Sequence, residues 1–61
     1  MNGLKARRKA LGLRQQDVAK AVGITQGRFS RYELGKQEPG VYTAIRIAET
    51  LKTTVEELFG S

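Results

Sequence analysis

Three glycines, at positions 12, 23 and 35, interrupt an otherwise helical spacing of apolar residues and limit helix length in the first half of the chain. Glycine often ends a helix, because it readily adopts the left-handed conformation required of the residue that follows. The pattern predicts three short helices in this half of the chain, over about residues 4–11, 15–22 and 26–34. No segment shows the alternation of a β-strand, so the chain is predicted to be all-α.

The second half continues the helical spacing after a turn. Pro39 suits the start of a fourth helix. The apolar stripe of that helix is predicted to contain Val41, Ala44, Ile45, Ala48 and Leu51. Thr54 and Glu57 have the spacing of a capping box, in which each residue bonds the backbone amide of the other. A fifth short helix carries Val55, Leu58 and Phe59 into the core. Residues 1–61 are therefore predicted to be a single domain, a compact bundle of five short helices.

The composition argues against several kinds of active site. The 61 residues include no cysteine and no histidine, the usual ligands of zinc, and histidine is also the usual general base. Ser30 and Ser61 have no base to activate them, and Glu56 and Glu57 are neighbours that face different ways on a helix. We therefore expect no enzymatic activity, metal, cofactor or small-molecule ligand. No apolar run approaches the roughly 18 residues of a membrane span, so a cytoplasmic protein without a membrane partner is expected.

Charge is divided unequally along the chain. Residues 1–36 carry nine lysines and arginines against Asp17 and Glu33, a net charge of +7, whereas residues 37–61 have a net charge of −2. A basic half beside an acidic half favours one face for a polyanion and another for a different contact. The alternative is that the basic residues only keep a small protein soluble.

Only Gly23, Ile24 and Thr25 separate the second and third predicted helices. So short a link, turning at a glycine, makes the two helices cross at a steep angle, which is the helix-turn-helix arrangement. The stretch from Leu4 to Phe59 resembles, without gaps, the Cro/phage-repressor family of helix-turn-helix domains, also called Xre-like. The resemblance rests on QQDVAKAVGIT, on the S-R-Y-E-x-G end of the third helix, and on the P…A…IA…L pattern of the fourth.

This resemblance implies that the helix over about 26–34 lies in the major groove of duplex DNA. Gln26, Gly27 and Arg31 match the family's base-reading positions, and the glutamine and arginine are suited to bidentate contacts with adenine and guanine. The residues expected at phosphates or flanking bases are Arg14, Gln15, Thr25, Arg28, Lys36 and Gln37. Gln15 matches a glutamine that also braces the recognition helix, and Thr25 caps that helix so that its amides point at phosphate.

Three positions depart from the family pattern. Gly27 stands where the family usually has a side chain that reads a base, so either the backbone approaches the groove closely or the contact is missing. Arg14 replaces a capping Ser or Thr, which loses a cap worth about 1 kcal/mol but offers a phosphate contact. Lys52 with Thr53 replaces a common glycine–apolar pair, which makes the turn after the fourth helix less favourable.

Two charged residues fall among the predicted core positions. Arg8 lies on the apolar stripe between Leu4 and Leu11, and Glu33 follows Phe29 by one helical turn. Isolated buried charges are costly, and the resemblance also implies an Arg–Glu pair between the first and third helices. We predict a partly buried ion pair that fixes the recognition helix. The alternative is that both side chains extend along their apolar stems to solvent.

These features predict a sequence-specific DNA-binding domain of a transcriptional regulator that acts as a repressor in the nucleoid. One domain of this size covers about one half-site, so we expect a palindromic operator with half-sites about 34 Å apart. A homodimer is expected at least on DNA, with its contact around the fifth helix. The competing prediction is a protein-interaction module, such as an antitoxin or adaptor of the same fold. Tyr42, off the apolar stripe, is predicted to be either surface or interface.

Overall fold

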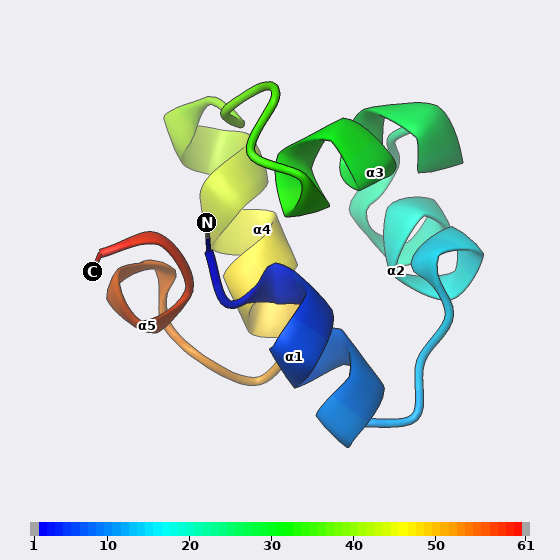
Figure 1. Ribbon diagram of the computed structural model, residues 1–61, viewed down its shortest axis with the longest axis horizontal. Coiled ribbons are helices and arrows are strands. Elements are labelled where there is room, and N and C mark those ends of the chain that lie inside the picture. Colours follow the sequence, from blue (N-terminus) through cyan, green and yellow to red (C-terminus); the bar gives the residue numbers. More distant parts are fainter. Residues whose placement is uncertain (1, 61) are drawn as a thin grey trace.

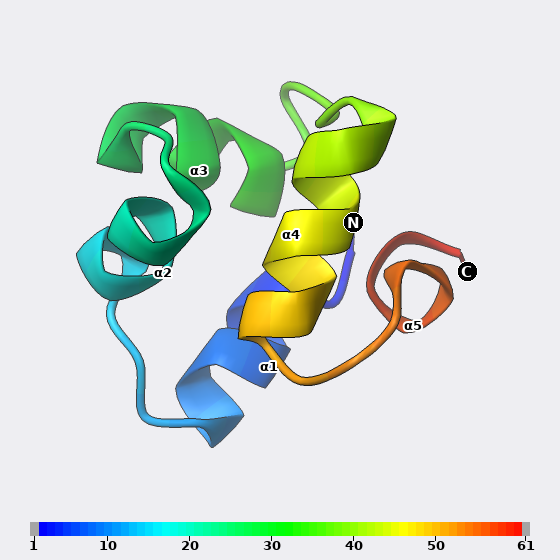
Figure 2. The ribbon, with the colours of Figure 1, turned by 180° about the vertical axis from the view of Figure 1, so that it is seen from behind.

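The computed structural model describes residues 2–60, which form five α-helices and no strand. The helices are α1 (Leu4–Ala10), α2 (Gln15–Val22), α3 (Gln26–Glu33), α4 (Val41–Thr50) and α5 (Val55–Phe59). In both ribbon views α4 lies centrally, with α2 and α3 on one side and α5 on the other (Figures 1 and 2). The predicted all-α bundle with adjacent second and third helices is confirmed. No helix within residues 2–60 is long and apolar enough to cross a membrane.

The core gathers apolar side chains from all five helices. Its largest fully buried side chains are Phe29, Leu4, Ile47, Leu51 and Val18. Smaller or slightly less buried contributions come from Ala19, Val22, Tyr32, Ala44, Ala48 and Leu58. Helix α2 packs against both α3 and α4, while α1 packs against α3 and α5 against α4. A core this small leaves a narrow margin of stability. Polar contacts at the edge of the core are therefore important for holding the helices in one arrangement.

The sequence prediction was partly wrong about the buried face of α4. Val41 and Ile45 are 74% and 42% exposed, whereas Ile47, which the predicted stripe omitted, is completely buried. Ala44, Ala48 and Leu51 are buried as expected. The apolar spacing of α4 is compatible with both faces, and the position of α2 decides which one is covered. With only five residues, α5 offers too little surface to cover the side of Val41 and Ile45.

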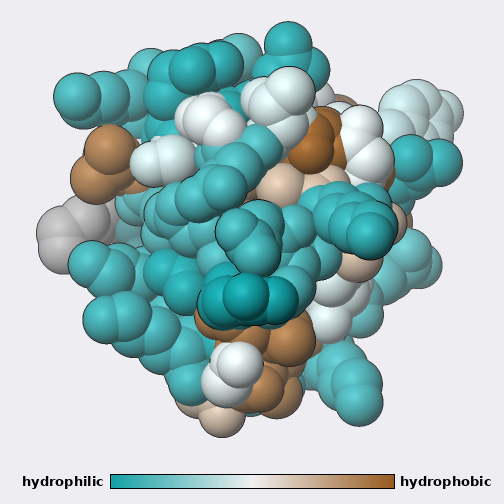
Figure 3. Space-filling view, turned by 90° about the vertical axis from the view of Figure 1, so that its right-hand side faces the viewer, coloured by the Kyte–Doolittle hydropathy of each residue, from teal (hydrophilic) through white to brown (hydrophobic). Residues whose placement is uncertain are grey.

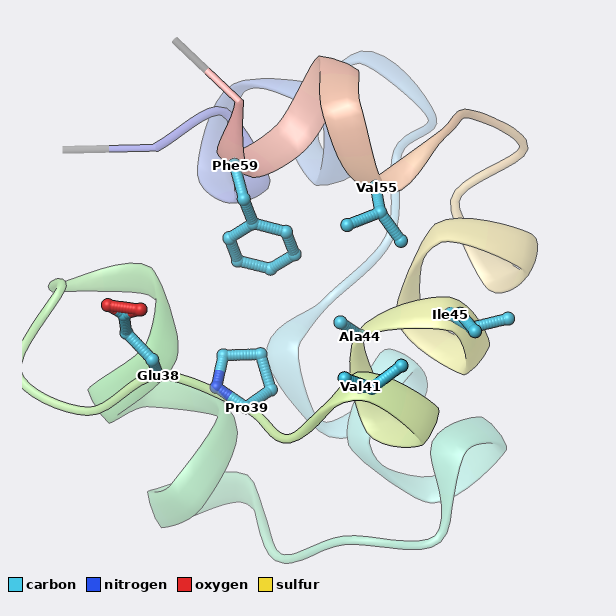
Figure 4. Close-up of a pocket in the computed structure, with 7 residues that line it drawn as sticks. All are labelled: Glu38, Pro39, Val41, Ala44, Ile45, Val55 and Phe59. Atoms are coloured by element: carbon cyan, nitrogen blue, oxygen red, sulfur yellow. The ribbon is translucent and has the colours of Figure 1, made fainter.

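Two further residues that were predicted to be buried, Leu11 and Val55, are exposed for the same reason: too little of the chain packs over them. Leu11 lies at the end of α1 and is 36% exposed, and Val55 is also 36% exposed. Leu58 is buried as predicted, and Phe59 is only half-buried against the core. Val41, Ile45, Val55 and Phe59 border an open groove of about 430 Å³ between α4 and α5 (Figure 4). Its lining residues are Glu38, Pro39, Val41, Ala44, Ile45, Val55 and Phe59.

Threonines begin α3 and α5 as predicted. The Oγ1 atom of Thr25 accepts a hydrogen bond from the Arg28 amide at 3.1 Å, and that of Thr54 accepts one from the Glu57 amide at 3.1 Å. The second bond of the predicted capping box, from the Thr54 amide to the Glu57 carboxylate, is not formed among the hydrogen bonds of residues 2–60. That half of the prediction was wrong: Glu57 contributes its amide and its charge to the first turn, and not a return bond.

The helix ends explain the spacing of the glycines. Gly12 and Gly35 follow α1 and α3 with φ angles of 71° and 73°, in the left-handed region. Lys52 takes the same position after α4 with a φ of 56°. There the amides of Lys52 and Thr53 donate to the carbonyls of Glu49 and Ala48 at 3.1 and 2.9 Å, which is a Schellman motif. A residue with a Cβ is strained in this conformation, so the turn is less favourable than a glycine turn, as predicted.

Replacement of Lys52 by glycine is expected to stabilise the protein. The Lys52→Gly variant relieves the strain at a φ of 56° and should raise the free energy of unfolding by about 0.5–1 kcal/mol, after the greater flexibility of the unfolded glycine chain is subtracted. Urea unfolding followed by circular dichroism measures this change. Lys52→Ala is the matched control, because it removes the same charge and keeps the Cβ. If both variants gained equally, charge and not backbone strain would be responsible.

Candidate nucleic-acid interface

A tight turn joins α2 to α3. Gly23 has a φ of 88°, and its amide and that of Ile24 both donate to the carbonyl of Ala19, at 2.8 and 3.0 Å. The Ile24 side chain packs against the core, and Thr25 then caps α3. The direction of α3 relative to α2 is thus set by one glycine conformation, one apolar anchor and one cap. This is the helix-turn-helix geometry predicted from the length of the link.

The two faces of α3 differ sharply in chemistry. Phe29, Tyr32 and Glu33 point inward and are buried. The residues exposed on the other face are Gln26, Gly27, Arg28 and Arg31. The exposed face contains amides and guanidinium groups and no carboxylate. Seen from the side of α2 and α3, the surface is covered mainly by hydrophilic side chains (Figure 3).

The predicted ion pair between Arg8 and Glu33 is present and buried. The Nε atom of Arg8 lies 2.6 Å from Oε2 of Glu33, and its Nη2 donates to Oε1 at 3.3 Å. The Nη1 atom of Arg8 donates to the Leu13 carbonyl at 2.9 Å. Only 10% of the Arg8 side chain and 4% of the Glu33 side chain are exposed. The alternative, in which both side chains extend to solvent, is therefore excluded.

The same carboxylate also fixes α2. The Nε2 atom of Gln15, the first residue of α2, donates to Oε1 of Glu33 at 2.8 Å. The Oε1 atom of Gln15 in turn accepts a longer hydrogen bond, 3.4 Å, from Nε2 of Gln26. A continuous chain of polar contacts thus runs from Arg8 in α1 through Glu33 and Gln15 to Gln26. We call Arg8, Glu33, Gln15 and Gln26 the polar relay.

The pKa of Glu33 reports the balance of forces at the centre of the relay. Burial by itself raises the pKa of this carboxyl group, because it disfavours the charged form. The hydrogen bonds from Arg8 and Gln15, together with the charge of Arg8, outweigh burial and hold the pKa below its ordinary value. Among residues 2–60, no buried side-chain nitrogen or oxygen lacks a hydrogen-bond partner. The relay is therefore fully satisfied as an ionised network.

Removal of Arg8 is expected to destabilise the fold strongly. Arg8→Ala leaves the Glu33 carboxylate buried without its cation, which should cost about 3–5 kcal/mol in the free energy of unfolding. This is comparable to the whole stability of a small domain, so the double variant Arg8→Met/Glu33→Met is measured beside it by urea unfolding. Because an apolar pair needs no ionic partner, the double variant should recover most of the loss. Arg8→Ala unfolding at the wild-type midpoint would contradict the structural role.

Stability should also fall on acidification. The folded-state pKa of Glu33 is depressed, so its contribution is fully present above the unfolded-state pKa of about 4.3 and is lost as the pH falls through the folded-state pKa. The free energy of unfolding of wild type should therefore drop between pH 6 and pH 3 by more than that of Glu33→Gln. Glu49→Gln, at an exposed position, is the control for loss of a surface carboxylate. Equal pH profiles for wild type and Glu33→Gln would show that Glu33 contributes nothing ionic.

Arg14 precedes α2 and forms an ion pair with Asp17. Its Nε and Nη2 atoms donate to the two carboxylate oxygens of Asp17 at 3.0 and 3.1 Å. Asp17 also accepts a hydrogen bond from the backbone amide of Arg14 at 3.0 Å. These hydrogen bonds from the side chain and the amide of Arg14 lower the pKa of Asp17. Arginine has no acceptor with which to cap a helix, so the expected loss of the side-chain cap is correct. The Asp17 carboxylate supplies half of a capping box in its place.

The loop after α3 folds back along that helix. The Lys36 amide donates to the Arg31 carbonyl at 3.0 Å, which places Lys36 and Gln37 near the C-terminal end of α3. Nε of Arg31 donates to Oε1 of Gln37 at 3.0 Å. Both loop residues and Arg28 are exposed. The predicted base-reading and phosphate-contacting residues therefore share one side of the molecule, around α3 and its two ends.

Sequence reasoning missed one arginine that joins α1 to the end of α4. Nε of Arg7 donates to the Leu51 carbonyl at 2.8 Å, and its Nη2 donates to the Lys52 carbonyl at 3.0 Å. Arg7 in α1 thus supplies hydrogen-bond donors to two carbonyl groups at the end of α4, the nearer of them 44 positions away in the sequence. No local signal identifies such a contact, because arginine on a basic helix usually faces solvent.

Comparison with known proteins agrees with the geometry. A family model described as helix-turn-helix matches residues 4–58, and the chain belongs to this family, of the Cro/C1 type. It is 40% identical over 55 residues to the uncharacterized HTH-type transcriptional regulator YqaE of Bacillus subtilis, covering 90% of this chain and 47% of that protein. It is 32% identical over 57 residues to the cryptic phage CTXphi transcriptional repressor RstR of Vibrio cholerae, covering 93% of this chain and 51% of the repressor.

Other relatives are closer in length. An uncharacterized HTH-type transcriptional regulator of Methanothermobacter thermautotrophicus is 35% identical over 57 residues, which cover 92% of this chain and 83% of that protein. The chain thus spans about half the length of the Bacillus and Vibrio relatives and most of the archaeal one. The family is one of DNA-binding regulator domains and not a class of enzyme. Among residues 2–60, no group of three potential metal ligands is found.

Proposed function

We propose that this protein binds duplex DNA sequence-specifically as a transcriptional regulator, with α3 in the major groove, and that it acts as a repressor by occupying an operator. The observation that carries the proposal is the exposed face of α3, which presents Gln26, Arg28 and Arg31 and no carboxylate, since Glu33 is buried on the opposite face. A helix that only faced solvent would gain from charges of both signs. An antitoxin or adaptor surface would favour apolar or mixed-sign residues, so this face favours DNA.

The proposed base readers are Gln26 and Arg31, with Gly27 between them on the same face. Gln26 suits adenine, and Arg31 suits guanine, through paired hydrogen bonds in the major groove. The contact from Gln15, at 3.4 Å, supports Gln26 from the side of α2. The capped start of α3 directs its free amides outward, where they suit a phosphate. The remaining proposed contacts to phosphates or flanking bases are Arg14, Gln15, Thr25, Arg28, Lys36 and Gln37.

We further propose that two copies bind a palindromic operator in the nucleoid. The molecule measures 25 × 22 × 19 Å, so one copy fills about one half-site, and a partner would lie about 34 Å away along the duplex. The exposed apolar residues Val41, Ile45 and Val55 lie on α4 and α5, in the acidic half of the chain. A contact there would keep the dimer interface apart from the basic surface of α3. Tyr42, which is 84% exposed, lies on α4 and would be part of this dimer contact.

The test is selection of bound sequences from a random duplex pool, followed by salt titration of the preferred sequence and a scrambled duplex. We expect a palindromic motif and a slope of log K against log salt of about −0.9 for each neutralised phosphate. Arg31→Ala and Gln26→Ala should each remove discrimination at one position, at a cost of about 1–3 kcal/mol, whereas Lys36→Ala should weaken binding to all sequences alike.

Two results would contradict these proposals separately. If no motif is enriched and binding is equally weak on both duplexes, the basic surface is only a nonspecific tether and sequence-specific regulation fails. If a motif is enriched but sedimentation shows one copy, free and on the palindrome, the dimer fails and the DNA-binding function stands.

A further inference from the structure

We propose that Gln37, in the loop after α3, is a positioning residue that aims Arg31 at its base, and that Gly27 provides the space in which Arg31 lies. This inference rests on the proposed function, because it assigns roles within the same DNA-reading surface. For Gln37 it replaces the phosphate contact proposed above, and for Gly27 it replaces the expectation that this residue reads a base itself. Three observations support it: the hydrogen bond between Arg31 and Gln37, the position of the Arg31 guanidinium beside Gly27, and the turn at Gly35.

The hydrogen bond fixes the orientation of the guanidinium plane. Oε1 of Gln37 accepts from Nε of Arg31 at 3.0 Å. An arginine held at Nε keeps the four N–H groups of its two terminal nitrogens free to donate. Guanine recognition uses two parallel N–H groups directed at O6 and N7. Gln37 therefore occupies the donor that base reading needs least and leaves the outward ones available.

Gly27 lies one turn before Arg31 on the same face of α3. A Cβ placed on Gly27 would come within 3.8 Å of Nη1 of Arg31; within residues 2–60, and leaving aside Gln26, Arg28 and the backbone of the helix, no other heavy atom lies within 4 Å. The guanidinium thus passes over Gly27, in the direction in which helical side chains lean. At 3.8 Å an added methyl group makes ordinary van der Waals contact, whereas a longer side chain would compete for the space. The path of Arg31 is thus compatible with glycine or alanine at position 27 and disfavours a longer side chain.

The turn after α3 brings Gln37 to this place. Gly35 has a φ of 73°, the Gly35 amide donates to the Tyr32 carbonyl at 3.1 Å, and the Lys36 amide donates to the Arg31 carbonyl at 3.0 Å. The backbone immediately before Gln37 is therefore bonded to the last turn of α3. A flexible arginine loses conformational freedom when it binds a base. If Gln37 orders Arg31 before binding, part of this loss has already occurred, and binding to guanine in that orientation is favoured.

The experiment is the sequence selection, carried out on matched variants. The base pair that Arg31 reads is identified as the position whose preference disappears in Arg31→Ala. At that position, Gln37→Ala should lower the preference for the selected base about five- to tenfold, while affinity for a scrambled duplex changes less than twofold. Gln37→Glu keeps an acceptor for Nε, so it should retain the preference even though its charge weakens binding to every duplex. Lys36→Ala is the control for a neighbouring phosphate contact.

A graded series tests Gly27. Gly27→Ala should retain the preference at the Arg31 position, and Gly27→Leu should lower it, because leucine fills the path of the guanidinium and makes no hydrogen bond of its own to a base. Thermal unfolding checks that each variant is folded; the exposed positions of Gln37 and Gly27 and the higher helix propensity of both replacements at 27 make this the expected result. A Gly27→Leu variant with an unchanged motif would overturn the role of Gly27.

Side-chain NMR of the free protein separates this inference from the function on which it rests. In the absence of DNA, the Nε–H group of Arg31 should be ordered in wild type and mobile in Gln37→Ala. If Gln37→Ala weakens all duplexes equally, or leaves both the order of Arg31 and the motif unchanged, Gln37 is not a positioning residue although DNA reading stands. If wild type selects no motif, base reading fails together with the proposed function, whatever the NMR shows.

Discussion

The carboxylate of Glu33 is the point on which the arrangement of the first three helices depends. It is buried, it lies at the end of α3, and it accepts hydrogen bonds from Arg8 of α1 and Gln15 of α2. An ionised group in this position is favourable only while both donors are present. The three helices are consequently held in one relative orientation by directional bonds. Apolar packing alone is less selective among orientations, because hydrophobic burial has no direction.

The proposed base readers are held in place by different contacts. Gln26 lies at the outer end of the polar relay and is connected through Gln15 to the buried carboxylate. Arg31 has no part in the relay; its side-chain partner is Gln37, in an exposed loop. The two proposed base readers are thus held by different parts of the molecule, one by the core and one by a turn. Substitutions in the loop are expected to alter the support of Arg31 without altering the fold, because Gln37 is exposed.

Most of the fold could be predicted from the sequence because its signals are local. The glycines at 12, 23 and 35 and the threonine caps mark helix ends, and the three-residue link between α2 and α3 fixes their crossing. Arg8 and Glu33 could be paired because a charge on an apolar stripe requires a partner. The exposure of Val41 and Ile45 could not be predicted, since it depends on how little of α4 the short α5 covers. The contacts of Arg7 with the end of α4 and of Arg31 with Gln37 are also set by tertiary placement and leave no local pattern.

Helix α3 shows why folding and recognition share one constraint in a chain of this size. Its eight residues include Gly27, two arginines and a glutamine on the outer face, and only Phe29, Tyr32 and Glu33 on the inner one. Eight residues of this composition would not form a stable helix alone in water. The helix exists because its inner face is packed and its carboxylate is bonded. The outer face therefore contributes little to the core, and the relay that stabilises α3 also sets the direction in which that face points.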